Sequence, residues 1–282
     1  MEHYDILIIG GGAAGIAAAK ECMGARVLLV DRKPKLGGVL LQCTHRGFGN
    51  HQTGVEYAAA LAEDFPESVT LALETTVLSV SEDRTALLAG REFGRRKVHF
   101  DQMILAAGCR EIPAGALNIG GTRPLGVYTA GQMQELVNLH GFQPQGPVVI
   151  LGSGDVGLIM AGQLARAGLA VTVVEKASRC GGNTVNQRCL RELPIRLICA
   201  DTISEIWGKP RISHCVTVGG ETLPCKTLLI AVGLMPEQEL ISHLGNPGWL
   251  HICGNCNQVH AMVESVVEEG EQAGRAAYEH TR

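Results

Sequence analysis

The sequence has few aromatic residues, few charged residues and no apolar run long enough to cross a membrane. Aromatic residues make up 4% of its 282 positions and charged residues 18%, and the formal net charge is −4. This charge argues against a basic nucleic-acid-binding protein. The apolar stretch from Ile6 to Ala19 has 14 residues and carries four glycines, so it is too short for a transmembrane helix. We therefore expect no integral membrane segment and no nucleic-acid partner.

The sequence also lacks the marks of a secreted, disulfide-rich protein. Its first five residues do not form the basic region of a signal peptide. Ten cysteines in a chain of this length do not make a disulfide scaffold, which is a feature of small secreted domains. The ten histidines show no ligand spacing, and we expect no metal site. These observations predict a cytoplasmic protein whose thiols are mostly reduced.

Glycine, in contrast, is abundant. The sequence contains 36 glycines, well above the average glycine content of about 7% in soluble proteins, and they lack the three-residue period of collagen. Apolar residues reach 46%, which excludes a disordered chain. The length corresponds to two domains at roughly 150 residues per domain. The glycines must serve local backbone geometry, and the places where they cluster should indicate the function.

The first glycine cluster has the form of a dinucleotide-binding fingerprint. A β-type apolar segment precedes Gly10, Gly12 and Gly15, and an Ala-rich helical segment follows. The acid Asp31 ends the next β-type segment, 21 residues after Gly10. In such a unit the first glycine permits a tight turn, the second a close approach to a pyrophosphate, and the third the packing of the helix on the strand. The helix N-terminus then attracts the phosphates, and the acid accepts hydrogen bonds from a ribose.

The same pattern returns in the second half of the chain. Gly152, Gly154 and Gly157 repeat the glycine spacing between a β-type segment and an apolar helical segment. Glu175 follows 23 residues after Gly152, at the end of the next β-type segment. A repeat of the whole pattern predicts two dinucleotide-binding domains in tandem.

The end of the chain is too short to form a third domain. Each copy of the repeat closes with an apolar segment that ends in glycine, Gly108 in the first and Gly233 in the second. After the second copy, residues 250–254 resemble one more strand, and residues 258–278 have the periodicity of a helix buried along one face. We expect this strand and helix to return and complete the first domain. The predicted domains are residues 1–115 with 245–282, and residues 116–244.

Two tandem fingerprints with a C-terminal return resemble the two-dinucleotide-binding-domain flavoproteins of the pyridine nucleotide–disulfide oxidoreductase superfamily. The resemblance implies an α/β fold of two tandem Rossmann-like domains, each a three-layer ββα arrangement, as in thioredoxin reductase and without a separate dimerisation domain. It also implies FAD in the first domain and NAD(H) in the second. NADP(H) is disfavoured, because Glu175 would bond a ribose 2′-OH and repel a 2′-phosphate.

Longer motifs resemble one subgroup of this superfamily. The stretches 38–49, 53–57, 126–131, 152–161 and 233–240 are similar to NAD/FAD-dependent oxidoreductases that accompany anaerobic glycerol-3-phosphate dehydrogenase. Relatives of that subgroup serve as flavoprotein subunits of amino-acid and cyanide-forming dehydrogenases. The resemblance implies small-molecule nucleotides as ligands and a partner dehydrogenase or electron-transfer protein, and it is compatible with a homodimer.

The fingerprints and the resemblance together define the predicted cofactor sites. Asp155 lies inside the second phosphate loop, where a carboxylate is unfavourable for a pyrophosphate unless its side chain points away. Asn255 stands where the wider superfamily has an aspartate, and the N-terminus of the helix at 258–278 is expected near the pyrimidine end of the flavin. The predicted cofactor-binding residues are Gly10, Gly12, Ala13, Ala14, Gly15, Asp31, Arg32, Gly37, Gly38, Ala107, Gly108, Gly152, Gly154, Asp155, Val156, Gly157, Glu175, Gly233, Gly254, Asn255 and Val259.

The cysteines do not have the spacing of a disulfide reductase of this superfamily. Such enzymes carry a cysteine pair after the Gly-Gly near the flavin or in the second domain, and here only Cys43 follows the Gly-Gly. Cys43 could act alone, with His45 or the flavin lowering its pKa, or it could be a buried apolar residue. Cys253 and Cys256 form a C-x-x-C pair, which is two ligands short of a zinc or iron–sulfur site.

Three functions are therefore open from the sequence. The first is an FAD-dependent NAD(P)H oxidoreductase that passes electrons to a partner protein or acceptor, as in a glycerol-3-phosphate or amino-acid dehydrogenase system. The second is an NADH oxidase or peroxidase that uses Cys43, with His45, as its catalytic residues. The third is a non-catalytic nucleotide-binding subunit of a dehydrogenase complex.

Overall fold

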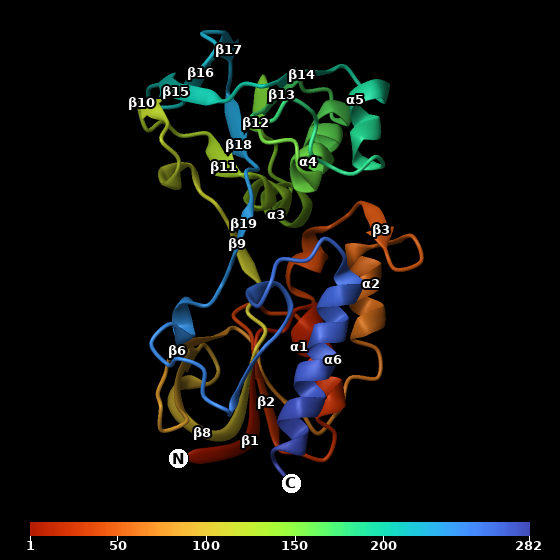
Figure 1. Cartoon of the computed structure of the whole chain (residues 1–282), viewed down its shortest axis with the longest axis vertical. Coiled ribbons are helices and arrows are strands. Elements are labelled where there is room, and N and C mark those ends of the chain that lie inside the picture. Colours follow the sequence, from red (N-terminus) through yellow and green to blue (C-terminus); the bar gives the residue numbers. More distant parts are fainter. The chain divides into compact units, whose positions relative to one another are not determined.

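The computed structural model describes residues 1–282, which form two compact units. One unit comprises residues 1–110 and 235–282, and the other comprises residues 111–234. The chain passes from one unit to the other twice, through strands β9 (Cys109–Glu111) and β19 (Leu234–Pro236), which pair with each other (Figure 1). The boundaries therefore lie at these connecting strands, five residues before the first boundary expected from the sequence and ten residues before the second.

The first unit is built on a seven-stranded sheet. Six strands follow the order β5–β2–β1–β8–β7–β6, and β20 pairs in parallel with the last residues of β8. Residues 6–9 of β1 and all of β2 are continuous apolar runs whose side chains are buried, as in a parallel sheet that is covered on both faces. The strands are β1 (Glu2–Ile9), β2 (Val27–Val30), β5 (Thr70–Ala72), β6 (Thr75–Val80), β7 (Thr85–Gly90), β8 (Gly94–Leu105) and β20 (Leu250–Ile252). A separate ribbon is formed by β3 (Arg46–Phe48) and β4 (Gln52–Thr53).

Helices cover one face of this sheet, and α1 and α6 lie side by side there (Figure 1). The two helices approach closely because α6 presents small residues: a Cβ atom on Gly270 would lie 2.3 Å from the Ala14 carbonyl oxygen. The thiol of Cys22 donates to the Gly274 carbonyl oxygen at 3.6 Å. The C-terminal helix thus belongs to the first unit. The helices are α1 (Ala13–Glu21), α2 (Gly54–Leu61) and α6 (Val263–Glu279), with the 3-10 turns η1 (Gly38–Gln42), η4 (Glu239–Ile241) and η5 (Gly254–Cys256).

The final helix begins later than the sequence predicted. Residues 258–262, which were expected within the helix, are not helical, and Met262 is 57% exposed. The backbone before the helix satisfies its donors in another way, since the His260 N–H donates to Asn255 Oδ1 at 3.0 Å. The apolar periodicity therefore extended across a turn that is held by side-chain hydrogen bonds.

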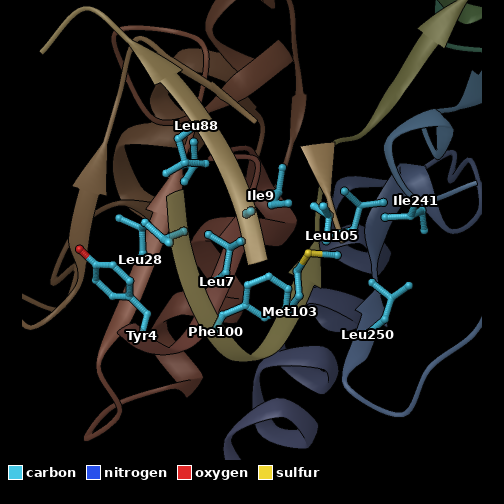
Figure 2. Close-up of a cluster of buried hydrophobic side chains, with 14 of the residues drawn as sticks. Tyr4, Leu7, Ile9, Leu28, Leu88, Phe100, Met103, Leu105, Ile241 and Leu250 are labelled. Carbon is cyan, nitrogen blue, oxygen red and sulfur yellow. The ribbon is translucent and has the colours of Figure 1, made fainter. Parts of the chain in front are cut away.

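The opposite face of the sheet carries a second apolar layer. Figure 2 shows Tyr4, Leu7, Phe100 and Met103 with Leu250 from the C-terminal return, all within one buried cluster. Strands β6 and β7 fold over this face and contribute further members of the cluster. The first unit thus has a β-meander, a sheet and a helical layer, as the ββα arrangement predicts.

The second unit repeats these three layers. Its five-stranded parallel sheet has the order β11–β18–β12–β13–β14, and a four-stranded sheet has the order β10–β15–β16–β17. One buried cluster lies between the parallel sheet and the helices, and another lies between the two sheets. The strands are β10 (Gly120–Gly121), β11 (Val127–Thr129), β12 (Val148–Leu151), β13 (Val171–Glu175), β14 (Ile195–Cys199), β15 (Ile203–Gly208), β16 (Ile212–Thr217), β17 (Thr222–Pro224) and β18 (Thr227–Ile230). The helices are α3 (Ala130–His140), α4 (Asp155–Arg166) and α5 (Cys189–Glu192), with the 3-10 turns η2 (Ala114–Ala116) and η3 (Asn186–Arg188).

None of these helices has both the length and the apolar composition that a membrane span requires.

Candidate dinucleotide-binding sites

Both fingerprints form the same strand–turn–helix. Gly10 and Gly152 have φ values of +109° and +103°, where a side chain is strained, and a Cβ atom on either would lie 2.3 or 2.2 Å from a carbonyl oxygen of the closing segment of its own unit. Gly15 and Gly157 pack the helix on the turn, since their Cβ atoms would lie 1.8 and 2.5 Å from the carbonyl oxygens of Gly10 and Gly152. These four positions require glycine for the fold itself.

The middle glycine of each fingerprint has a different environment. A Cβ atom on Gly154 would meet no atom within 4 Å, and one on Gly12 would meet only a backbone carbon at 4.0 Å. Both residues are the N-caps of their helices, and neither offers a side chain to the free N–H groups of the first turn. The N-termini of α1 and α4 are therefore open to an anion, which fits a pyrophosphate on residues 13–15 and 155–157.

Each acid at the end of the second strand is tied to its own glycine loop. Asp31 accepts from the Gly11 N–H at 2.6 Å and from the Lys33 N–H at 2.7 Å. Glu175 accepts from the Ser153 N–H at 2.8 Å, from the Ser153 hydroxyl at 2.6 Å and from the Ala177 N–H at 2.8 Å. A carboxylate has about four lone-pair positions, so each acid keeps capacity to accept from a ribose hydroxyl.

The hydrogen bonds also lower the pKa of the Glu175 carboxyl. Burial by itself would raise this pKa, but the bonds from Ala177 and Ser153 together hold it below its ordinary value. The side chain is therefore ionised at neutral pH.

A segment rich in glycine crosses each fingerprint. In the first unit the Gly37 N–H donates to the Gly11 carbonyl oxygen at 2.8 Å, and in the second the Gly182 N–H donates to the Ser153 carbonyl oxygen, also at 2.8 Å. The second crossing was not predicted from the sequence, although the pair Gly181-Gly182 follows Glu175 as closely as Gly37-Gly38 follows Asp31. The duplication therefore includes this crossing as well as the fingerprint.

The two copies differ at the first residue of the helix. This residue is Ala13 in α1 and Asp155 in α4. Asp155 Oδ1 accepts from the Asn183 N–H at 2.8 Å and from Asn186 Nδ2 at 2.7 Å. The carboxylate is thus turned toward the crossing segment, yet its charge remains at the N-terminus of α4.

The remaining predicted residues lie around these loops. Ala107 and Arg32 are exposed. Ala14 is a buried residue of α1, and Val156 is a partly buried residue of α4. Gly108 and Gly233 have positive φ values of 76° and 135° at the ends of the closing strands. Each lies three residues beyond the end of its strand, after Leu105 of β8 and Ile230 of β18.

The C-terminal turn of the first unit is organised by one carboxylate. Glu269 accepts from the Gly254 N–H at 2.8 Å, and its Oε1 lies within hydrogen-bond distance of His260 Nε2, also at 2.8 Å. Asn255, expected to face a ribityl hydroxyl, instead uses its Oδ1 to accept from the His260 N–H at 3.0 Å, so its Nδ2 is the group left for a ligand. Val259 lies in this turn rather than on a helix.

Cys43 does not have the environment of a reactive thiol. Its side chain is 8% exposed, and burial raises the pKa of the thiol to about 12. The expectation that His45 lowers this pKa is not met, because burial also lowers the pKa of His45 and leaves a neutral imidazole. The His45 Nδ1 atom is buried and has no hydrogen-bond partner. An unpaired buried nitrogen costs free energy, so a ligand that pairs with it fits this position.

The C-x-x-C pair is also buried and reduced. Cys253 and Cys256 are free thiols, and both donate to the Leu105 carbonyl oxygen, at 3.8 and 3.0 Å. Burial raises the pKa of both. These thiols therefore serve as donors within the core of the first unit.

Comparisons with known proteins agree with this geometry. The family model described as pyridine nucleotide-disulphide oxidoreductase matches residues 4–248. The chain is 30% identical over 283 residues to an opine oxidase subunit from Agrobacterium tumefaciens (strain Ach5), covering 86% of this chain and 55% of that protein. It is 33% identical over 186 residues to hydrogen cyanide synthase subunit HcnB of Pseudomonas protegens, covering 62% of this chain and 39% of that protein. The chain thus spans about half the length, or less, of these curated relatives.

Solved structures confirm the predicted α/β fold of two tandem Rossmann-like domains. Thioredoxin reductase of Lactococcus lactis has a TM-score of 0.80 at 22% identity, and that of T. acidophilum has 0.76 at 19%, each covering 99% of both chains. With the family match over residues 4–248, the chain belongs to the pyridine nucleotide-disulphide oxidoreductase family.

Proposed function

We propose that this chain oxidises NADH, holds FAD in its first unit, and passes electrons to a partner protein or another acceptor. The observation that carries the proposal is the presence of two complete nucleotide loops, each with an open helix N-terminus and an acid fixed to the loop. Bound FAD supplies the redox chemistry, because it accepts a hydride and releases the electrons in a later step. The residues of the chain bind and orient the two nucleotides.

In the first unit the proposed FAD site follows the first fingerprint. The open N-terminus of α1 receives the pyrophosphate, and Asp31 accepts from the adenosine ribose. The crossing at Gly37 and Gly38 brings the chain close to the cofactor, since a Cβ atom on Gly38 would lie 3.0 Å from the Gly12 Cα. The unpaired Nδ1 of His45 offers one hydrogen-bonding group toward a ligand.

In the second unit the proposed site takes the nicotinamide nucleotide. The N-terminus of α4 receives its pyrophosphate, and the ionised Glu175 accepts from the 2′-OH of its adenosine ribose. This arrangement supports NADH in preference to NADPH. Asp155 opposes the pyrophosphate and lowers the affinity without preventing binding.

The buried thiol of Cys43 argues against the oxidase or peroxidase alternative. A peroxidatic cysteine reacts as its thiolate, whereas burial raises the pKa of Cys43 to about 12. We infer that Cys43 packs in the core and that electrons leave by another route.

The names of the curated relatives indicate which kind of partner protein to propose. The similar proteins carry the names of subunits of an opine oxidase and a hydrogen cyanide synthase, and this chain matches only part of each. We propose that it works with a partner dehydrogenase of the kind that oxidises glycerol 3-phosphate or an amino acid.

Anaerobic titration of the FAD-loaded protein with NADH tests the proposal. NADH should bleach the visible absorption of the flavin, and NADPH should do so only at much higher concentration. A protein that stays colourless after incubation with FAD and gel filtration would contradict the assignment of the first site. The Cys43→Ser variant should keep its rate with an electron-accepting dye, whereas loss of an NADH-dependent peroxide reduction in that variant would revive the cysteine mechanism.

A second candidate function is a nucleotide-binding subunit without redox turnover of its own. The position of Asp155 favours it, because a carboxylate at the second phosphate loop weakens the binding of a dinucleotide. The same titration separates the two candidates: a flavin that is bound but not bleached at saturating NADH supports the second.

A further inference from the structure

Two strands of the first unit bring together three metal-ligating side chains that lie far apart in the sequence. His3 is on β1, and His99 and Asp101 are on β8. One ligand atom of each lies within 4.8 Å of the others. No sequence motif indicates this cluster, because the two histidines are separated by 96 residues.

The sheet register explains the juxtaposition. β1 and β8 are parallel neighbours, and His3 is directly paired with His99, as Tyr4 is with Phe100. Tyr4 and Phe100 are buried in the core, so the alternation of side chains along a strand places the two histidines on the other face. Asp101 lies two residues beyond His99 and therefore shares its face.

The three groups already interact. His3 Nε2 lies 3.1 Å from Asp101 Oδ2, and the rings of His3 and His99 stack with their centroids 5.4 Å apart. The His3 and Asp101 side chains are 46% and 39% exposed, so an ion from solvent can reach them. In a tetrahedral zinc site, ligands at about 2.0–2.2 Å from the metal lie about 3.3 Å from one another. The His3–Asp101 pair has nearly this separation, and the His99 ligand atom lies within 4.8 Å of both.

We propose that His3, His99 and Asp101 form a surface site for zinc or a similar divalent transition metal. Imidazole nitrogens with one carboxylate suit Zn²⁺, Co²⁺ or Ni²⁺, whereas Mg²⁺ and Ca²⁺ prefer ligand sets made of oxygen. Three protein ligands leave the fourth position to water, as in open zinc sites. The bound ion would link the first residues of β1 to β8 and so stabilise the N-terminal end of β1 in the sheet. The site is independent of the nucleotide sites.

Calorimetric titration of the untagged, reduced full chain with Zn²⁺ alone tests the site. We expect one equivalent to bind, with loss of binding in His99→Ala and weaker binding in Asp101→Asn. His140→Ala, at the exposed end of α3 in the other unit, is the matched control and should bind as the unchanged protein does. Binding should weaken at mildly acidic pH, because protons compete for the imidazoles. The thermal midpoint of the unchanged protein should rise with Zn²⁺, and that of His99→Ala should not.

Substitution of cobalt for zinc separates this site from the ten cysteines. Co²⁺ bound by imidazole and carboxylate gives weak visible bands, whereas thiolate ligands add an intense near-ultraviolet charge-transfer band. Weak bands that disappear in His99→Ala support the proposal. Absence of saturable Zn²⁺ binding, binding that persists in His99→Ala, or a thiolate band would each overturn it. The circular dichroism of His99→Ala without metal establishes that the variant is folded.

Discussion

The replacement Asp155→Asn tests whether this carboxylate weakens nucleotide binding in the second unit. Asparagine has the same shape, and its Oδ1 can still accept from the Asn183 N–H and from Asn186 Nδ2, as Asp155 Oδ1 does. The crossing segment is therefore expected to stay in place. The change removes one negative charge from the N-terminus of α4, where the fingerprint predicts a pyrophosphate. We expect NADH to bind more tightly.

The magnitude follows from the position of the charge. A pyrophosphate held by the first N–H groups of the helix would lie about 6 Å from the carboxylate, where two unit charges repel by about 0.7 kcal/mol in water and about 3 kcal/mol at an effective dielectric constant of about 20. Asp155 is half-buried, and the helix dipole offsets part of its charge. A gain of about 1–2 kcal/mol is therefore expected, which is a roughly 5- to 30-fold decrease in the Kd of NADH.

The assay is a fluorescence titration of the FAD-loaded protein with NADH at low and at high salt. The gain should shrink as salt rises, because the Debye length falls from about 10 Å at 0.1 M to about 3 Å at 1 M. Glu192→Gln removes an exposed charge from the end of α5 in the same unit and should leave the Kd within about twofold of its starting value. An unchanged or higher Kd in Asp155→Asn would refute the reasoning and would show that the carboxylate mainly holds the crossing segment.

Three further predictions concern the glycine loop, the acid of the second unit and the buried thiols. Gly15→Ala should lower the free energy of unfolding by about 3 kcal/mol, since its Cβ would lie 1.8 Å from a backbone oxygen. Gly12→Ala, whose Cβ would have no atom nearer than 4.0 Å, should keep the thermal midpoint but lose FAD affinity. Equal thermal midpoints in the two variants would contradict this. Glu175→Gln should reduce the preference for NADH over NADPH by about tenfold in relative Kd, and an unchanged ratio would remove the proposed role. Burial raises the pKa of Cys22 and Cys43 from 9.0 to about 12, so the folded state retains protons that the unfolded chain loses above pH 9. Stability measured by urea unfolding should fall by up to about 1.4 kcal/mol per pH unit and thiol between pH 9 and pH 12, and a flat profile in that range would be inconsistent with the burial.

Local signals in the sequence explain why the fingerprint turns and the buried strands were predicted well. A fingerprint is a contiguous stretch in which each glycine answers one steric demand, so Gly10 and Gly15 could be assigned from their spacing alone. The buried strands are short apolar runs bounded by such turns. The start of α6 was predicted too early, because apolar periodicity gives no sign of the hydrogen bond from the His260 N–H to Asn255 in the turn before the helix.

Features that depend on the fold could not be predicted in this way. The pKa of Cys43 is raised by burial, which depends on how the folded chain packs around the thiol, and burial also lowers the pKa of its neighbour His45. The pairing of His3 with His99 depends on strand order in the seven-stranded sheet. Both require contacts that no local motif encodes.

Comparison of equivalent positions in the two units distinguishes the residues that the fold requires from those that we propose to bind ligands. Within the fingerprints, the glycines whose Cβ atoms would clash with backbone are the same in both copies: Gly10 corresponds to Gly152, and Gly15 to Gly157. The positions that differ, Ala13 against Asp155 and Asp31 against Glu175, belong to the two loops that we propose to bind nucleotides. The two turns have the same steric requirement, so glycine is kept at these positions. The positions 13/155 and 31/175 have no such requirement, so the charge and the length of their side chains can differ. The divergence at these two positions is therefore what we expect of a duplicated fold whose copies serve different nucleotides.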